Sequence, residues 1–208
     1  HVVNAAFWNM GENCSAASRL IVHQAVKEPL MERILARLRD WKTGDPLNPA
    51  HHLGALIDAE HCANVASYLT GTALAGGTAD GPYVQPTIFE VSAKDARAVD
   101  EIFGPILSVL TVASNDEAIA LANDTRYGLA ASVFTANTRN AIRAARDIKA
   151  GTVTVNTYGE GSIATPFGGY KQSGFGGRDN GIHAHDQFTE TKTIWIDLTD
   201  PRDGDNVD

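Results

Sequence analysis

The feature that most constrains the fold of this 208-residue chain is an alternation of apolar runs and helical patterns in its second half. Apolar runs rich in β-branched residues predict strands, and the patterns between them predict helices, the first of which Ser114 and Glu117 suit as a capping box. Such alternation favours a mostly parallel sheet with helices on both faces. We therefore expect one α/β domain with a three-layer αβα architecture. In chain order the segments are the strand 106–112, the helix 114–123, the strand 130–134, the helix 138–149 and the strand 151–155.

The first half of the chain predicts a strand, two helices and two further extended segments. Pro29 suits the first turn of the first helix, and Asp58 suits the N-cap of the second. Pro86 limits the last extended segment to an edge or irregular strand. These elements are the strand 19–23, a helix from about residue 30 that ends by Trp41, a helix over 58–69, and extended segments 72–76 and 84–89.

The C-terminal part of the chain is less regular. Residues 157–181 are rich in glycine and lack periodicity, which predicts a long loop of the kind that is usually functional. Residues 191–196 alternate with period two, which predicts a strand that pairs with another subunit. We divide the chain into a cysteine-bearing domain (1–186), an oligomerisation strand (187–198) and an acidic tail (199–208) that we expect to be disordered.

Composition excludes several classes of partner. A net charge of −8 disfavours nucleic acid and anionic membranes, because both select basic surfaces. No apolar run has the length of a membrane span, and the first residues lack a signal pattern. Two cysteines are too few for a disulfide framework, so we expect a reducing compartment and a cytoplasmic protein. The histidines and cysteines lack metal-ligand spacing, and no metal site is expected.

Cys14 is the candidate nucleophile. It follows the turn-forming residues 9–11, and the small residues 14–18 have the character of a helix start. Backbone N–H groups at a helix start would favour the thiolate, which is the nucleophilic form of cysteine. The alternative is that Cys14 is a small buried residue, and this interpretation is preferred for Cys62.

Four short motifs resemble those of the aldehyde dehydrogenase family and stand in that family's order. They are Gly11-Glu12-Asn13-Cys14-Ser15, Glu101-Ile102-Phe103-Gly104-Pro105, Val155-Asn156-Thr157-Tyr158 and Pro166-Phe167-Gly168-Gly169-Tyr170-Lys171-Gln172-Ser173-Gly174. The resemblance covers roughly residues 5–198 and is to the C-terminal, catalytic half of such enzymes, nearest to those that oxidise amino-aldehydes. It implies that residues 1–186 are a catalytic domain and that NAD or NADP is the cofactor.

The resemblance also implies roles for individual residues. Cys14 would attack the aldehyde carbonyl to give a thiohemiacetal, hydride would pass to NAD or NADP, and the remaining thioester would be hydrolysed. The backbone N–H of Cys14 would donate to the oxyanion. Glu101 would accept hydrogen bonds from the nicotinamide ribose, and Phe103 would pack beside the nicotinamide ring. Asn156 would orient groups near the cysteine.

Three further residues bear on the substrate. Trp8 and Phe167 match family positions that line the substrate tunnel, although aromatic residues are usually part of a core. Glu160 lies near aromatic residues and could bind the cationic end of an ω-amino-aldehyde; the alternative is a solvated loop acid. Glu12 stands where the family often has glutamine, and we assign it no role.

The resemblance finally implies partners beyond these residues. In the family, the general base, the cofactor domain and the asparagine that completes the oxyanion hole would precede residue 1. We therefore expect an N-terminal cofactor domain as partner, a homo-oligomer formed through residues 191–196, and little activity or NAD affinity in residues 1–208 alone. Two other functions stay open: a non-enzymatic dimerisation or binding module with the same fold, and a thiol esterase that uses Cys14 without a cofactor.

Overall fold

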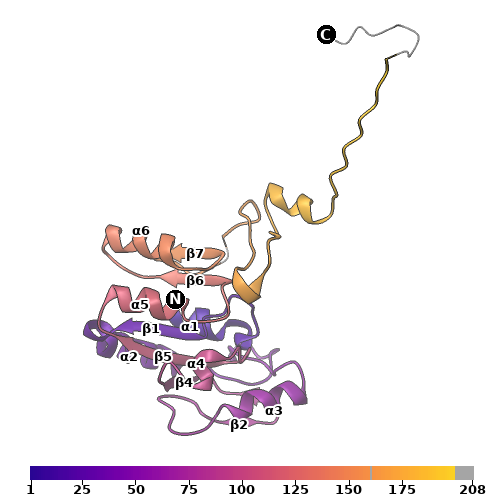
Figure 1. The fold of residues 1–208 in the computed structure, drawn as a ribbon. Coiled ribbons are helices and arrows are strands. Elements are labelled where there is room, and N and C mark those ends of the chain that lie inside the picture. The colour runs from indigo at the N-terminus through magenta and orange to yellow at the C-terminus, as the bar shows by residue number, and fades with distance from the viewer. Residues whose placement is uncertain (160, 200–208) are drawn as a thin grey trace.

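The computed structural model describes residues 1–159 and 161–199, and a three-stranded parallel sheet lies at its centre (Figure 1). The strand order is β1-β5-β4, with Leu20 opposite Val109 across the β1–β5 pair. Six of the seven residues of the central strand are buried, as its largely apolar, apolar-flanked sequence predicted. The three strands are β1 (Arg19–His23), β4 (Thr87–Glu90) and β5 (Ile106–Val112).

Helices cover both faces of this sheet. Successive residues of a strand point to opposite faces, so Leu107 and Ile106 belong to different helical layers. Leu107 packs in a buried cluster with α1 (Val2–Phe7) and α2 (Gln24–Leu38), whereas Ile106 packs in a second cluster with α3 (Ala59–Ser67). The three-layer α/β prediction is therefore confirmed.

A second parallel sheet consists of β6 (Ala130–Val133) and β7 (Thr152–Val155), joined by α6 (Thr138–Asp147). Figure 1 shows this pair in orange, beyond the β1 edge of the larger sheet. No residue of either strand is buried. A cavity of about 990 Å³ is lined by both β1 and β6. The connection from β5 to β6 contains α5 (Asn115–Asn123).

Side-chain caps start two helices where the sequence predicted them. Asp58 Oδ1 accepts a hydrogen bond from the His61 N–H at 2.8 Å, at the start of α3. Ser114 Oγ accepts from the Glu117 N–H at 3.1 Å, at the start of α5. The Glu117 carboxylate accepts from the N–H of Ala113 at 2.7 Å, one residue earlier than in a standard capping box. The remaining short elements are η1 (Trp8–Gly11), β2 (Ala79–Asp80), β3 (Tyr83–Val84), α4 (Ala96–Val99), η2 (Lys171–Ser173) and η3 (Ile182–Gln187).

The helix predicted to start at Cys14 does not form. Cys14 lies in a turn, and residues 16–18 have no regular secondary structure. The carbonyl of Ser18 accepts a hydrogen bond from the N–H of Ser108 at 2.9 Å, so pairing with β5 begins before β1 itself. Small Ala and Ser residues suit a turn as well as a helix start, and the neighbouring strand decides between them. The helix-terminus argument for a Cys14 thiolate is therefore wrong.

Two boundaries in the first half also differ from the prediction. Helix α2 begins at Gln24 rather than near residue 30, because the His23 ring accepts a hydrogen bond from the Ala25 N–H at 3.2 Å and caps the helix. Pro29 consequently lies in the second turn of α2. Residues 72–76 form no regular strand; Ala75 makes only an isolated antiparallel bridge to Ile88.

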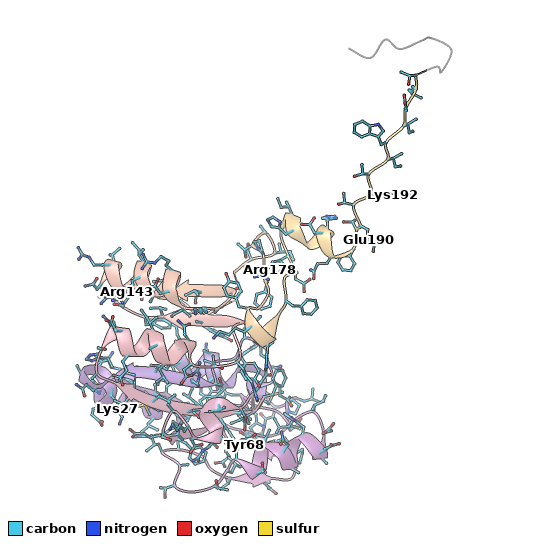
Figure 2. All side chains as sticks on the ribbon, in the orientation of Figure 1. Lys27, Tyr68, Arg143, Arg178, Glu190 and Lys192 are labelled. Atoms are coloured by element: carbon cyan, nitrogen blue, oxygen red, sulfur yellow. The ribbon has the colours of Figure 1, made fainter. Side chains whose placement is uncertain are left out.

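The segment 191–196 is not hydrogen-bonded as a strand within the described part of the chain. Figure 2 shows this segment, with Lys192 labelled, extending away from the body of the domain, and Ile194, Trp195 and Ile196 are exposed. A strand needs a neighbouring strand, so the expected pairing with another subunit stays a prediction. The disorder expected for the tail (199–208) falls almost entirely on residues 200–208, which lie outside the described residues, and it stays a prediction. No helix within residues 1–159 or 161–199 has the length and apolar character needed to cross a membrane.

Candidate active site

Cys14 lies in the loop that leads from η1 into β1. Three successive residues before it, Asn9, Met10 and Gly11, have left-handed φ values of 52°, 58° and 70°. Asn and Gly adopt this conformation more readily than other residues. The side-chain amide of Asn9 also donates to the carbonyl of Glu12 at 2.8 Å, which stabilises the turn. The turn leaves Cys14 exposed.

This loop meets a second loop, residues 101–105, through two glycines. A Cβ added to Gly11 would lie 2.4 Å from the carbonyl oxygen of Gly104. A Cβ added to Gly104 would lie 2.8 Å from a methyl carbon of Val65 in α3. Neither position has room for a side chain, so the two loops are in direct backbone contact and pack against α3.

The second loop presents an acid and an aromatic ring. Phe103 has a left-handed φ of 56°, an unfavourable conformation for a bulky residue that costs on the order of 1 kcal/mol or more. Phe103 is 40% exposed, and Glu101 is exposed as well. Cys14, Glu101 and Phe103 all line the cavity of about 990 Å³. The structure therefore brings the predicted nucleophile and both predicted cofactor residues to one cavity.

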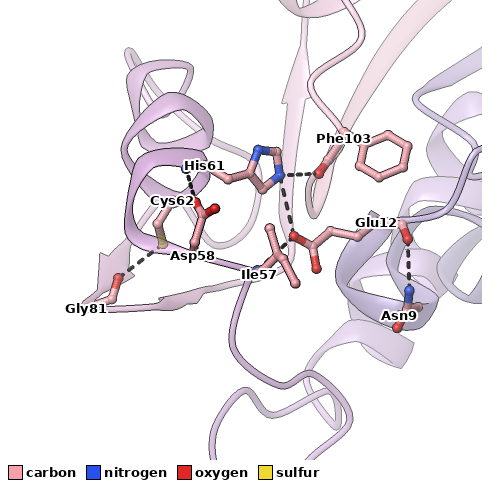
Figure 3. A network of polar contacts seen from close by, with 8 residues as sticks. All are labelled: Asn9, Glu12, Ile57, Asp58, His61, Cys62, Gly81 and Phe103. Atoms are coloured by element: carbon pink, nitrogen blue, oxygen red, sulfur yellow. Dashed lines mark hydrogen bonds and ion pairs between the residues drawn. The ribbon is translucent and has the colours of Figure 1, made fainter.

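A network of polar contacts lies behind these two loops (Figure 3). His61, on α3, has its Nε2 atom 2.7 Å from the Phe103 carbonyl oxygen and 3.5 Å from Oε1 of Glu12. The same Glu12 oxygen accepts a hydrogen bond from the Ile57 N–H at 3.0 Å. Neither Glu12 nor His61 was assigned a function from the sequence. The departure of Glu12 from the family's usual glutamine was the only signal.

The two cysteines have different surroundings. Cys62 is buried in α3, and its thiol donates to the carbonyl of Gly81 at 3.2 Å. Burial, followed by the negative charges of Glu12 and Asp58, raises the pKa of the Cys62 thiol. Cys14 is exposed beside the cavity. The interpretation of Cys62 as a buried packing residue agrees with this environment.

The other predicted site residues either do not line this cavity or lie outside the described residues. The Asn156 side chain is bonded to the Thr135 backbone, accepting from its N–H at 2.9 Å and donating to its carbonyl at 3.0 Å. Trp8 is 60% exposed, and Phe167 forms a two-residue bridge with Asp179. None of Trp8, Asn156 and Phe167 lines the cavity, whereas Tyr158 does. Glu160 lies outside the described residues.

No group of three or more His, Cys, Asp or Glu residues within residues 1–159 and 161–199 is arranged to hold a metal ion. For an organic cofactor, the exposed Glu101 carboxylate can accept two hydroxyl hydrogen bonds, and the Phe103 ring can pack on a planar group. The geometry thus offers a thiol, a carboxylate and an aromatic ring at one cavity, which suits covalent chemistry beside a ribose-bearing cofactor.

Comparisons with known proteins agree with this chemistry. The aldehyde dehydrogenase family model matches residues 1–194. The chain is 57% identical over 207 residues to an aminoacetaldehyde dehydrogenase of Pseudomonas aeruginosa, covering 96% of this chain and 42% of that protein. It is 41% identical over 200 residues to the NADP/NAD-dependent aldehyde dehydrogenase PuuC of Escherichia coli, covering 92% and 40%. A solved indole-3-acetaldehyde dehydrogenase of P. syringae, in complex with NAD+, matches with a TM-score of 0.90 at 44% identity, covering 95% and 42%. The chain therefore spans about two fifths of the length of these relatives.

Proposed function

This chain belongs to the aldehyde dehydrogenase family, and we propose that it supplies the nucleophilic cysteine and the nicotinamide-facing loop of an enzyme that oxidises an aldehyde to an acid. The observation that carries the proposal is the exposed Cys14 at the same cavity as Glu101 and Phe103. The rest of the active enzyme is supplied by polypeptide outside residues 1–208.

The reaction begins at Cys14. Its thiolate attacks the aldehyde carbon, a C–S bond forms, and the carbonyl π electrons move to the oxygen, where the Cys14 backbone N–H donates a hydrogen bond. NAD or NADP, if held beside Glu101 and Phe103, would supply the hydride acceptor that oxidation of this adduct to a thioester requires. Water then attacks the thioester, the C–S bond breaks, and the acid leaves with the Cys14 thiol restored.

The loop 101–105 holds the cofactor end of this arrangement. Glu101 would accept hydrogen bonds from the ribose hydroxyls nearest the nicotinamide, and Phe103 would pack against the ring. The relatives support this assignment: one is described as NADP/NAD-dependent and another was solved with NAD+. Asn156 is proposed to order the end of β7 through its two bonds to Thr135, and so to orient groups near the cysteine.

The proposed substrate is an ω-amino-aldehyde. The 57% identical relative is described as an aminoacetaldehyde dehydrogenase, and Tyr158 lines the cavity just before Glu160 in the sequence. A carboxylate and an aromatic face together attract a cationic amine. Glu160 is the proposed partner of the amine, and Trp8 and Phe167 are the proposed tunnel walls.

An N-terminal cofactor domain is the proposed partner of this chain, and the cavity between β1 and β6 supports contact with further polypeptide. Ser18 and Val133 direct their carbonyls to β5 and β7, respectively. Alternate residues of a strand direct their backbone N–H and C=O groups to opposite sides. Ile21 is three positions from Ser18, and Ser132 is one position from Val133, so the backbone groups of Ile21 and Ser132 point the other way, toward the cavity between the sheets. An added strand would satisfy both edges. The amide hydrogens of Ile21 and Ser132 should then exchange more slowly in a polypeptide of the relatives' length than in residues 1–208 alone. Equal exchange in both would contradict this contact.

Oligomerisation through residues 191–196 is proposed from the exposed Ile194, Trp195 and Ile196. These apolar side chains and the unpaired backbone of the segment suit addition to a sheet of another subunit. A polypeptide cut after Gln187 should lose the native assembly in sedimentation analysis. An unchanged assembly would contradict the proposal.

A cytoplasmic location is also proposed, from the scarcity of cysteine. The function is therefore tested with a polypeptide of the relatives' length that is expressed in the cytoplasm and purified. Reduction of NAD and NADP is followed with a short ω-amino-aldehyde and with the uncharged aldehyde of equal length. We expect preference for the amino-aldehyde, and Glu160→Gln should lower its kcat/KM about tenfold, equivalent to about 1.4 kcal/mol, while sparing the uncharged substrate. Glu190→Gln is the matched control. A polypeptide that assembles but reduces no cofactor would favour the binding module, and Cys14-dependent ester hydrolysis without cofactor would favour the esterase.

A further inference from the structure

We propose that His61 is a positioning residue for the cofactor loop, and that Glu12 holds its ring in place. This inference rests on the proposed function, because it assumes that Phe103 faces the nicotinamide ring. Figure 3 shows the arrangement: His61 extends from α3 toward the Phe103 carbonyl, and Glu12 approaches the same ring nitrogen from the cysteine loop.

The contacts identify the ring nitrogen of His61 that carries a hydrogen. Nε2 faces two oxygens, the Phe103 carbonyl at 2.7 Å and Glu12 Oε1 at 3.5 Å. A carbonyl and an ionised carboxylate can only accept hydrogen bonds, so Nε2 must carry the hydrogen. The shorter distance shows that the Phe103 carbonyl receives it. Glu12 therefore acts mainly through its charge and its position beside the ring.

Glu12 is itself fixed from two sides. Its carboxylate accepts from the Ile57 N–H at 3.0 Å, just before α3, and its backbone carbonyl accepts from the Asn9 amide at 2.8 Å. The Glu12 side chain is 12% exposed and that of His61 is 20% exposed, so water competes little for these contacts. One imidazole thus connects the loop that carries Cys14 with the loop that carries Phe103.

Phe103 needs such support because its backbone is left-handed, with φ of 56°. A bulky residue keeps this conformation only where its surroundings impose it. Gly11 and Val65 fix the following residue, Gly104, by close contact. The His61 hydrogen bond fixes the carbonyl of Phe103 itself. Without that bond the loop should sample conformations in which the ring no longer faces the cofactor.

His61 is not a candidate for the reaction itself. It is not among the residues that line the cavity shared by Cys14, Glu101 and Phe103. Its contacts reach Phe103 from the side of α3, and its ring lies edge-on to the Phe103 ring, with centroids 6.5 Å apart. The expected consequence of its loss is therefore a change in cofactor binding rather than in the chemistry of Cys14.

The test uses the polypeptide of the relatives' length and compares His61→Ala, His61→Gln and Glu12→Gln, with the exposed Glu60→Ala on α3 as the matched control. We expect His61→Ala to lower the fraction of molecules whose loop 101–105 can bind the cofactor to about a tenth. The KM for the cofactor should therefore rise about tenfold. The KM for the aldehyde and the alkylation rate of Cys14 without cofactor should stay within about twofold. The glutamine at position 61 retains an N–H donor and should restore most of the affinity.

Glu12→Gln should raise the cofactor KM by about two- to threefold, and adding it to His61→Ala should have no further effect, because Glu12 acts through the ring. An unchanged cofactor KM in His61→Ala, equal rises in both KM values, or failure of His61→Gln to recover would each overturn the inference. NADH binding, followed by its fluorescence, separates this outcome from failure of the proposed function. An unmutated protein that neither binds NADH nor oxidises aldehydes refutes both, whereas an active protein indifferent to His61→Ala refutes only the positioning role.

Discussion

The two parallel sheets of this protein have the same hydrogen-bond pattern but very different burial. In the larger sheet, β5 is flanked by strands on both edges and by helices on both faces, and six of its seven residues are buried. In the β6–β7 pair no strand residue is buried, although α6 connects the strands in the usual way. Parallel pairing alone therefore does not make a core; a second covering layer does.

The predicted site residues are divided between the two sheets in a corresponding way. The loops that carry Cys14, Glu101 and Phe103 adjoin β1 and β5 of the buried sheet, and they meet at one cavity. Asn156 and Phe167 follow β7 of the exposed pair, and neither lines that cavity. The well-packed sheet thus supplies the fixed part of the site, and the exposed pair supplies residues whose roles depend on further contacts.

The largest expected effect concerns the packing of the two sheets directly. Leu107→Ala in β5 should lower the free energy of unfolding by about 3 kcal/mol, because Leu107 is fully buried and the substitution leaves a cavity. Val153→Ala in β7 should cost less than about 1 kcal/mol, because that side chain is only half-buried. Urea denaturation measures both. Equal losses would show that the β6–β7 pair is as well packed in solution as the larger sheet.

The second prediction compares the two thiols. Cys14 is exposed, whereas Cys62 is buried and its thiol has a raised pKa. At neutral pH, iodoacetamide should modify Cys14 at least about tenfold faster, because Cys14 is accessible and the raised pKa of Cys62 lowers the thiolate fraction of that buried thiol. The modification rate of Cys62 should rise at a higher pH than that of an ordinary thiol. Peptide mapping identifies the modified residue, and preferential labelling of Cys62 would contradict the assignment.

The smallest expected effect compares two ion pairs, one beside each sheet. At the start of α4, which contacts β5 of the larger sheet, Asp95 accepts three hydrogen bonds from Arg97, and the Arg97 side-chain hydrogen bonds hold the pKa of Asp95 below its usual range. A lowered pKa stabilises the fold above the unfolded-state pKa, and this contribution is lost as the pH falls through the lower, folded-state pKa. Asp95→Asn should cost about 1 kcal/mol at neutral pH, since the carboxylate is still partly exposed, and little in acid.

The matched variant for that prediction is Asp147→Asn, next to the β6–β7 pair. Arg146 also lowers the pKa of Asp147, but the Arg146 side chain is 71% exposed, against 16% for Arg97, so water screens this pair more strongly. Thermal midpoints at neutral and acidic pH should therefore change little in Asp147→Asn. A loss as large as that of Asp95→Asn would remove the contrast between the two regions.

The sequence predicted the buried sheet better than its surroundings, and particular residues show why. Five apolar residues among the seven of β5 define a buried strand locally, and Asp58 and Ser114 cap helices through bonds to residues only three positions away. The turn at Cys14 depends on pairing of Ser18 with Ser108, which no local pattern reveals. The segment 191–196 needs a partner strand, so its pattern alone could not place it.

The same limit applies to the site. The motifs around Cys14 and Glu101 were sufficient to predict that these residues act together, because the family resemblance links them. The contact between Glu12 and His61 joins two segments that are distant in the sequence, and neither segment marks it. Asn156 was predicted beside the cysteine, but its amide is bonded to Thr135, and its role in catalysis stays a prediction.

The central claim is that Cys14, held by the loops of the buried sheet, is the covalent nucleophile. The most direct test is mass analysis of peptides after the polypeptide of the relatives' length is mixed with aldehyde and NAD and quenched in acid during turnover. We expect a mass increase equal to the acyl group on the peptide that contains Cys14, with the Cys62 peptide unchanged and no adduct in Cys14→Ser. Continued turnover in Cys14→Ser, or an acyl group on Cys62 in its place, would contradict the account.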